Sequence, residues 1–82
     1  MTTDEQALAN IAANLSRLLA DRKWSQSDLA RAAGEAIVNI NRAVRGVNMP
    51  GAGLLGRIAE ALDVSVDRLL ADPPQRNFQK SA

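Results

Sequence analysis

Cysteine and histidine are both absent from this 82-residue sequence, and aromatic residues make up only 2% of it. Without cysteine the chain has no disulfide or thiolate chemistry, and without either residue type it lacks the usual zinc ligand sets. The absence of histidine also leaves the serines without an imidazole base to activate them. We therefore expect a protein that is not an enzyme and that binds no metal or other cofactor.

Long hydrophobic runs are also absent. No stretch approaches the roughly 18 apolar residues of a membrane span, and the first five residues, Met1 to Glu5, are not the basic start of a signal peptide. The sequence therefore predicts a cytoplasmic protein with no membrane partner. No feature of it indicates a small-molecule substrate.

The residues that are present favour a small helical protein. Apolar residues make up 46% of the chain and are mostly alanine, leucine, isoleucine and valine. A chain of this length forms one small domain that buries only about 60% of its unfolded surface. The formal net charge is +1, but the segment 36–59 contains Arg42, Arg45 and Arg57 and no acidic residue. This local excess of positive charge favours a face that binds a polyanion.

Capping residues and apolar spacing predict five helices. Thr3 and Ser25 are each followed three residues later by a glutamine or an aspartate, as in a capping box. Gly34 and Gly46 end the second and third helices, because glycine adopts the positive φ of a helix end without steric cost. We therefore expect an all-α, compact five-helix bundle. The first three expected helices span about 3–21, 25–34 and 36–45. Pro50 suits a loop or a first turn, after which the apolar residues of 54–62 mark a fourth helix, and a fifth spans about 65–70.

The end of the fifth predicted helix is the expected domain boundary. Asp72 is followed by Pro73 and Pro74, and proline cannot continue a helix. We therefore expect one domain over residues 1–71 and a polar C-terminal tail or linker over residues 72–82.

Between Gln26 and Gly46 the spacing of small and apolar residues is typical of a helix-turn-helix. Ala30 falls where two short helices would cross too closely for a larger side chain. Gly34, four residues later, provides the tight turn, and Ile40 returns an apolar side chain from the next helix to the shared core. The sequence therefore predicts a helix-turn-helix that binds duplex DNA.

Two further motifs accompany this pattern. The first is Trp24, Ser25 and Gln26 ahead of Leu29, Ala30 and Gly34, and the second is the run from Ile58 to Leu70. With them, roughly residues 15–70 resemble the lambdoid phage repressor and Cro proteins and their relatives among the xenobiotic-response-element regulators. The resemblance implies a lambda-repressor-like fold whose third helix lies in the major groove. It also implies a homodimer on a palindromic operator, with half-sites about 34 Å apart.

The resemblance implies which residues lie in the groove. The groove positions of the family fall on Ala36, Ile37, Val38, Asn41, Arg42 and Arg45. Arg42 fits guanine O6 and N7, and Asn41 fits adenine. Ile37 or Val38 fits the methyl group of thymine. The expected base-reading residues are therefore Ile37, Val38, Asn41 and Arg42.

Contacts to the DNA backbone position a protein without reading the sequence. The resemblance places Gln26 against a phosphate, and there it would lie in the first turn of a helix whose free amides attract an anion. We expect further backbone contacts from Lys23, Arg22, Arg45 and Asn48.

These residues also have simpler interpretations. Arg42 and Arg45 could form an ordinary solvated face. Ile37 could belong to the core, since its spacing continues the apolar stripe of its helix. Lys23 and Arg22 could simply end the first helix, where cations favour the negative end of the dipole.

The chain departs from the family pattern at several positions. Glu35 replaces an apolar residue, Ala36 replaces a serine or threonine cap, and Ala43 replaces a larger aliphatic residue. Leu19 and Val44 stand where many relatives have an arginine and a glutamate that pair. Because an apolar pair can replace a buried ion pair without loss of stability, we expect Leu19 to contact Val44.

Gly51, Gly53 and Gly56 match the GxGxxG pattern of dinucleotide-binding folds. That fingerprint requires a preceding strand and a βαβ unit, and nothing before Pro50 is typical of a strand. We therefore interpret the match as a loop and a helix start built from small residues.

Together these features predict a sequence-specific transcriptional regulator that binds double-stranded DNA, with a repressor of phage or mobile-element origin preferred. Alternatives of the same class are a restriction-system controller protein, an antitoxin that represses its own operon, and an activator. An alternative of another class is a helical adaptor that binds protein through Ile37 and Val38. For the homodimer, the expected contacts are Leu69, Leu70 and Phe78.

Overall fold

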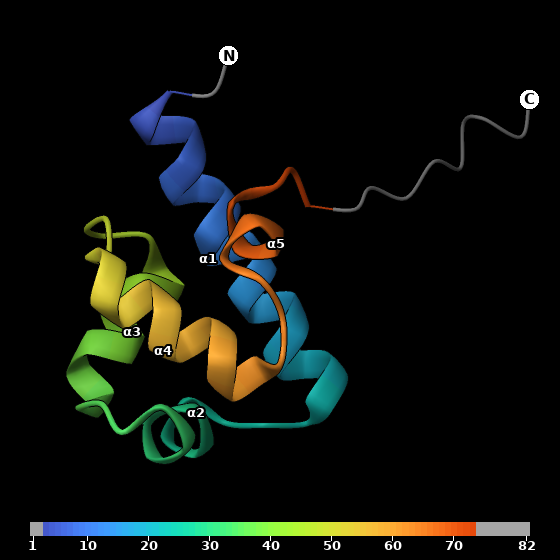
Figure 1. Ribbon diagram of the computed structural model, residues 1–82, viewed down its shortest axis with the longest axis vertical. Helices are drawn as coiled ribbons and strands as arrows, with labels where there is room; N and C mark the ends of the chain where they lie inside the picture. The colour runs from blue at the N-terminus through green and yellow to red at the C-terminus, as the bar shows by residue number, and fades with distance from the viewer. Residues whose placement is uncertain (1–2, 74–82) are drawn as a thin grey trace, which may run out of the picture.

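The fold is all-α, as predicted. The structure is a computed structural model that describes residues 3–73, and these contain five helices and no strand. No helix among them is both long enough and apolar enough to cross a membrane. The first three helices and the fifth begin and end within two residues of the predicted positions, and Pro50 lies in the loop before α4. The helices are α1 (Asp4–Arg22), α2 (Gln26–Ala33), α3 (Ile37–Arg45), α4 (Ala52–Leu62) and α5 (Val66–Leu70) (Figure 1).

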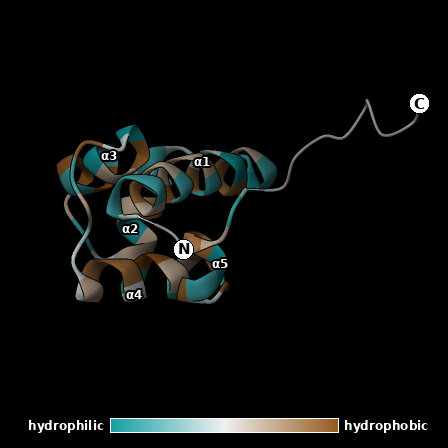
Figure 2. Ribbon diagram, turned by 90° about the horizontal axis from the view of Figure 1, so that it is seen from above, coloured by the Kyte–Doolittle hydropathy of each residue, from teal (hydrophilic) through white to brown (hydrophobic). Residues whose placement is uncertain are grey.

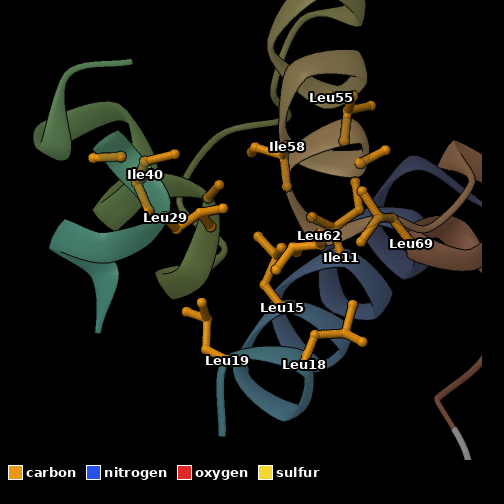
Figure 3. Packing of buried hydrophobic residues seen from close by; sticks show 13 residues of the cluster. Ile11, Leu15, Leu18, Leu19, Leu29, Ile40, Leu55, Ile58, Leu62 and Leu69 are labelled. Carbon is orange, nitrogen blue, oxygen red and sulfur yellow. The ribbon is translucent and has the colours of Figure 1, made fainter. Parts of the chain in front are cut away.

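The helices enclose one hydrophobic core to which every helix contributes. Helix α1 packs against both α3 and α5, which lie apart from each other, and α2 packs against α3 and α4. Bands of hydrophobic and hydrophilic residues follow one another along α1 and α3 (Figure 2), as expected for helices with one buried face. The core consists of Ile11, Leu15, Leu18, Leu19, Leu29, Ala30, Ile40, Ala43, Leu55, Ile58, Ala59, Leu62 and Leu69 (Figure 3).

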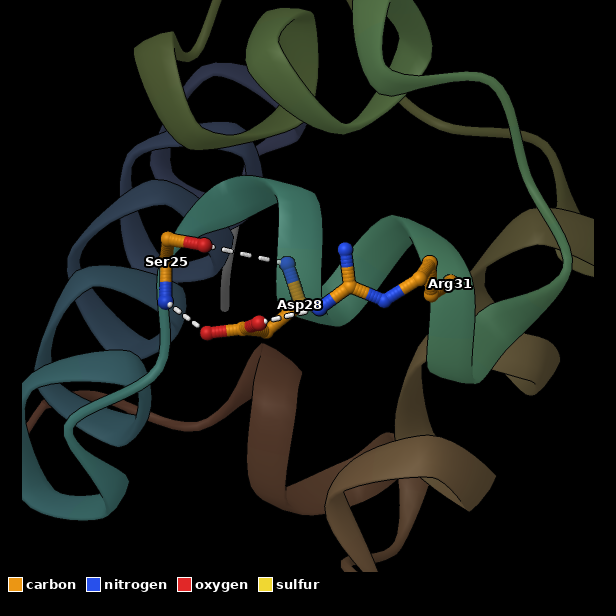
Figure 4. A network of polar contacts seen from close by, with 3 residues as sticks. All are labelled: Ser25, Asp28 and Arg31. Carbon is orange, nitrogen blue, oxygen red and sulfur yellow. Dashed lines mark hydrogen bonds and ion pairs between the residues drawn. The ribbon is translucent and has the colours of Figure 1, made fainter.

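Helix α2 begins with the predicted capping box. The Ser25 hydroxyl accepts a hydrogen bond from the Asp28 backbone amide at 3.1 Å, and the Asp28 carboxylate accepts one from the Ser25 amide at 2.8 Å (Figure 4). The hydrogen bond from the Ser25 amide, with help from the nearby Arg31 guanidinium, holds the pKa of Asp28 below its ordinary value. Local sequence therefore fixes the start of this helix.

The capping box predicted at the start of α1 forms only in part. The Thr3 hydroxyl accepts a hydrogen bond from the Gln6 backbone amide at 3.0 Å, as expected for a cap. The Gln6 side chain does not return to Thr3, because it donates to the Asn10 side chain at 3.0 Å. The prediction of a reciprocal box here is thus corrected to a single cap.

Four helices end in the left-handed backbone conformation. Gly34 has a φ of 65° and Gly46 a φ of 70°, which confirms that these glycines end α2 and α3. Lys23 and Asp63 adopt the same conformation at the ends of α1 and α4, with φ values of 57° and 59°. For residues with a Cβ atom this conformation costs conformational energy.

Two buried asparagines attach α5 to α1, a feature that sequence reasoning missed. Asn14 donates from its side-chain amide to the backbone carbonyl oxygens of Leu69 and Ala71, each at 2.8 Å. Asn10 donates to the carbonyl oxygen of Leu70 at 3.0 Å. These bonds satisfy carbonyl groups at the end of α5 that have no partner within the helix.

The structure corrects one of the predicted dimer contacts. Leu69 is fully buried in the core, with 0% of its surface exposed, so its side chain has no surface to offer a second chain. Leu70 is half-buried and packs against the core from outside, and it remains a candidate. Phe78 lies outside the described residues.

Two other expectations concern packing and the glycine pattern. Leu19 is buried, and Val44 packs against the cluster that includes Leu19; a direct contact between the two stays a prediction.

Gly51 is the N-cap of α4, and no strand precedes it within residues 3–73. The GxGxxG match is therefore the loop and helix start that we expected.

Candidate nucleic-acid interface

The turn between α2 and α3 holds α3 firmly against the rest of the protein. Ala30 on α2 is buried, and so are Ile40 and Ala43 on α3, with Ile40 0% exposed. After Gly34, the Glu35 backbone amide donates to the Ala30 carbonyl oxygen at 2.9 Å and closes the turn. The N-cap residue of α3 is Ala36, whose side chain makes no capping hydrogen bond. The buried face of α3 therefore positions the helix.

The opposite face of α3 is exposed. Val38, Arg42 and Arg45 follow one another at intervals of four and three residues, which places them on one side of a helix. Val38 is 54% exposed, and both arginines are exposed. The predicted groove face therefore contains two solvent-accessible guanidinium groups. Ile37 is 50% exposed as well, so the alternative that it belongs to the core is wrong.

The arginines of this face are not neutralised by other side chains. Arg42 and Arg45 are exposed, and neither forms a salt bridge with another described residue; the same holds for Lys23 at the end of α1. Arg45 makes only a long contact of 3.5 Å with the side-chain oxygen of Asn41. These three charges are therefore available to an external anion.

Arg22, predicted to contact the DNA backbone, is engaged elsewhere. Its guanidinium donates to the carbonyl oxygen of Leu62 at the end of α4, and the residue is half-buried. A cation is favoured there because the last carbonyl groups of a helix have no partner within it. We therefore leave Arg22 out of the proposed DNA contacts.

Arg57 does not add to the positive face, because Glu35 neutralises it. The Arg57 guanidinium forms a salt bridge with the Glu35 carboxylate, whose side chain is only 14% exposed. Asn39 donates to the same carboxylate at 2.8 Å. The Asn39 hydrogen bond and the Arg57 charge lower the pKa of Glu35 below its ordinary value of 4.5. This arrangement connects the α2–α3 turn to α4 and was not foreseen from the sequence.

Gln26 and Asn41 meet where α2 and α3 come together. The Asn41 side-chain amide donates to the side-chain oxygen of Gln26 at 3.0 Å, and both residues are half-buried. The sequence predicted both residues as DNA contacts but gave no sign that they pair.

The loop after α3 adds residues to the same region. Asn48 and Met49 line a hollow of about 190 Å³ together with Arg42 on α3. Asn48 is exposed, as a backbone contact requires. Val47 and Met49 are also large exposed apolar residues, with 49% and 42% of their surface accessible. The sequence analysis did not single out these two residues. The signal that could have found them was the presence of apolar residues in the short loop after the third predicted helix.

The fold and this face define a DNA-binding helix-turn-helix domain. A family model described as helix-turn-helix matches residues 15–69. Because the match spans more than half of the chain, the chain belongs to this helix-turn-helix family, which is of the lambda repressor and Cro type. DNA binding and transcription regulation are the functions of this family.

Among solved structures, the chain is similar to the crystal structure of the hypothetical transcription factor NHTF from Neisseria. The TM-score is 0.78 and the sequence identity is 28%, over 89% of this chain and 85% of that chain. No curated protein sequence matches the chain.

Proposed function

We propose that this chain is a sequence-specific regulator of transcription that binds duplex DNA through α3. The observation that carries the proposal is the exposed face of α3, where Val38, Arg42 and Arg45 point away from a buried face formed by Ile40 and Ala43. An α-helix fits the major groove, where each base pair presents a distinct pattern of donors and acceptors. The preferred mode of action is repression by occupying an operator, in a phage or mobile-element setting.

In this proposal the exposed side chains divide between bases and backbone. Arg42 donates two hydrogen bonds to a guanine, and Val38 or Ile37 packs against a thymine methyl group. Lys23 and Arg45 contact phosphates. Gln26 and Asn48 are the uncharged backbone contacts.

We further propose that two copies bind a palindromic operator with half-sites one helical turn apart, about 34 Å. Leu70 is the described residue left as a candidate dimer contact. A restriction-system controller, a self-repressing antitoxin or an activator would use the same face on DNA and differ only in what the bound protein does to transcription.

A helical adaptor that binds protein is the second candidate function. It is favoured by the exposed apolar residues of α3 and the following loop, namely Ile37, Val38, Val47 and Met49. The free cations Arg42 and Arg45 beside them favour DNA instead, because an apolar protein contact gains nothing from unpaired charges.

Selection of bound duplexes from a random pool by the purified protein tests the proposal. We expect enrichment of one consensus with two inverted halves, and loss of enrichment in the double variant Arg42→Ala, Arg45→Ala. An asymmetric single consensus would reject the dimer and keep the regulator. A folded protein that enriches no duplex would reject DNA reading and leave the adaptor.

A further inference from the structure

The hydrogen bond between Asn41 and Gln26 joins the two helices of the helix-turn-helix by their side chains. Gln26 is the first residue of α2 and Asn41 is the fifth residue of α3. The donor is the Asn41 side-chain nitrogen Nδ2 and the acceptor is the Gln26 side-chain oxygen Oε1, 3.0 Å apart. Both side chains are half-buried, so the bond is partly shielded from competing water.

This bond fixes which way the Gln26 amide faces. A glutamine side chain has one acceptor oxygen and one nitrogen with two hydrogens. Because Oε1 faces Asn41, the nitrogen Nε2 is directed away from it, and Nε2 donates to no other described residue. A phosphate can only accept hydrogen bonds. An amide that was free to turn would present its oxygen to the phosphate in part of the population, and that orientation repels.

The same bond occupies Asn41. Its Nδ2 donates to Gln26, and its oxygen Oδ1 lies 3.5 Å from the Arg45 guanidinium. On α3 the residue lies toward α2, beside the outward row of Val38, Arg42 and Arg45 and not within it. Reading adenine requires both the oxygen and the nitrogen of the asparagine amide, and here the nitrogen is already engaged by Gln26.

We propose that Asn41 is a positioning residue, which holds Gln26 with its Nε2 toward a DNA phosphate, and that it does not read a base. This inference rests on the proposed function, because it needs DNA bound at α3. It predicts that Asn41 acts through Gln26: the phosphate contact is lost when Gln26 is removed and is weakened when Asn41 is removed, and base preference is kept when Asn41 is removed.

The test measures binding to a duplex containing the selected consensus, unmodified and with a single neutral methylphosphonate placed at each backbone position in turn. In the wild type, a methylphosphonate at any contacted phosphate weakens binding, and at one of these positions in each half-site Gln26→Ala is insensitive to it. We expect Gln26→Ala to bind the unmodified duplex about tenfold more weakly per half-site, as for loss of a hydrogen bond to a charged group. Asn41→Ala should bind between the wild type and Gln26→Ala and should lose part of the sensitivity at the same phosphate, because Gln26 still donates to it in part of the population.

Two further measurements distinguish positioning from base reading. The double variant Gln26→Ala, Asn41→Ala should bind no more weakly than Gln26→Ala alone, since the second change removes an interaction already lost. Asn41→Ala should select the wild-type consensus. The positioning role is wrong if the affinity losses of the two single variants multiply in the double variant. It is also wrong if Asn41→Ala relaxes the preference at one base pair.

Asn39→Ala is the matched control, because Asn39 is the same residue type on the same helix but is held by Glu35. It should keep the sensitivity to the methylphosphonate. If it also loses that sensitivity, the effect of Asn41→Ala reflects general loosening of α3, and the inference fails.

A second variant keeps the size of the side chain. In Asn41→Asp the new carboxylate can only accept, so Gln26 must turn Nε2 toward it and Oε1 toward the phosphate. Binding should then be weaker than for Asn41→Ala. Equal or stronger binding would contradict the inference. If the wild type itself binds no duplex, the proposed function fails and this inference fails with it.

Discussion

On α3 the role of each residue follows from the direction of its side chain. Successive residues of an α-helix are about 100° apart, so Ile40 and Ala43 lie inward, Arg42 lies outward, and Asn41 lies to the side that meets α2. Periodicity alone predicted that Ile40 lies inward and Arg42 outward, but it also placed Ile37 inward, and that residue is 50% exposed. It did not predict which flank meets α2, because that depends on the angle at which the two helices cross.

At the scale of single residues, Arg42 is the residue on which sequence preference should depend most. Arg42→Ala is expected to cost about 1 to 3 kcal/mol of binding free energy at one base position and to relax the preference there, since a bidentate contact to guanine is lost. Competition with duplexes changed at one base pair at a time measures this. A similar loss on every duplex would make Arg42 a phosphate contact.

The pH dependence of stability should depend on Glu35. Its pKa is lower in the folded protein because Asn39 and Arg57 favour the ionised carboxylate, so the folded state binds fewer protons than the unfolded state. The resulting stabilisation is present above the ordinary pKa and is lost as the pH falls through the lowered one. We therefore expect Glu35→Gln to lose less stability than the wild type on acidification below about pH 4.5.

Urea unfolding at a series of pH values tests this expectation. Asn39→Ala keeps the carboxylate but removes its main donor, so it should reduce the same pH dependence in part. Wild-type and Glu35→Gln curves that run parallel from neutral to acid pH would show that Glu35 contributes nothing to it.

At the scale of the elements, helix ends have the same backbone conformation with and without glycine. Gly34 has a φ of 65° and open space where a Cβ would lie, so Gly34→Ala should lose about 1 kcal/mol of unfolding free energy from backbone strain alone. Asp63 has a φ of 59°, so Asp63→Gly should gain up to about 1 kcal/mol. Unfolding in urea measures both. Shifts of the same sign would contradict this explanation.

The elements were predictable because their signals are local. Caps such as Ser25 and turn residues such as Gly34 act within a few residues of their own position, so all five helices could be placed from the sequence. The helix-turn-helix spacing then predicted the exposed arginines of α3.

The side-chain partners between elements were not predictable. Arg22 donates to the end of α4, Glu35 pairs with Arg57, and Asn14 holds the end of α5. Each bond joins residues distant in the chain and depends on how the helices pack. Leu69 was misplaced for the same reason: on a five-residue helix, apolar spacing does not tell a core residue from a dimer contact.

At the scale of the whole molecule, charge is uneven although the formal net charge is only +1. Arg42 and Arg45 lie on one side of α3 and are exposed without ion pairs to described residues, whereas Arg22 and Arg57 have partners within the fold. A local concentration of free cations attracts a polyanion even when the total charge is small. Release of counterions from DNA then makes binding strongly dependent on salt.

The measurement that tests DNA binding most directly is a fluorescence anisotropy titration of a labelled duplex between about 50 and 200 mM salt. For the wild type we expect the logarithm of the binding constant to fall linearly with the logarithm of the salt concentration, by about 0.9 for each phosphate neutralised. Arg45→Ala and Lys23→Gly should each reduce that slope by about one per subunit. Glycine is chosen at Lys23 because alanine would keep the strain of its positive φ. Binding that does not change with salt, or a wild-type protein that binds no duplex at about 50 mM salt, would contradict DNA recognition by α3.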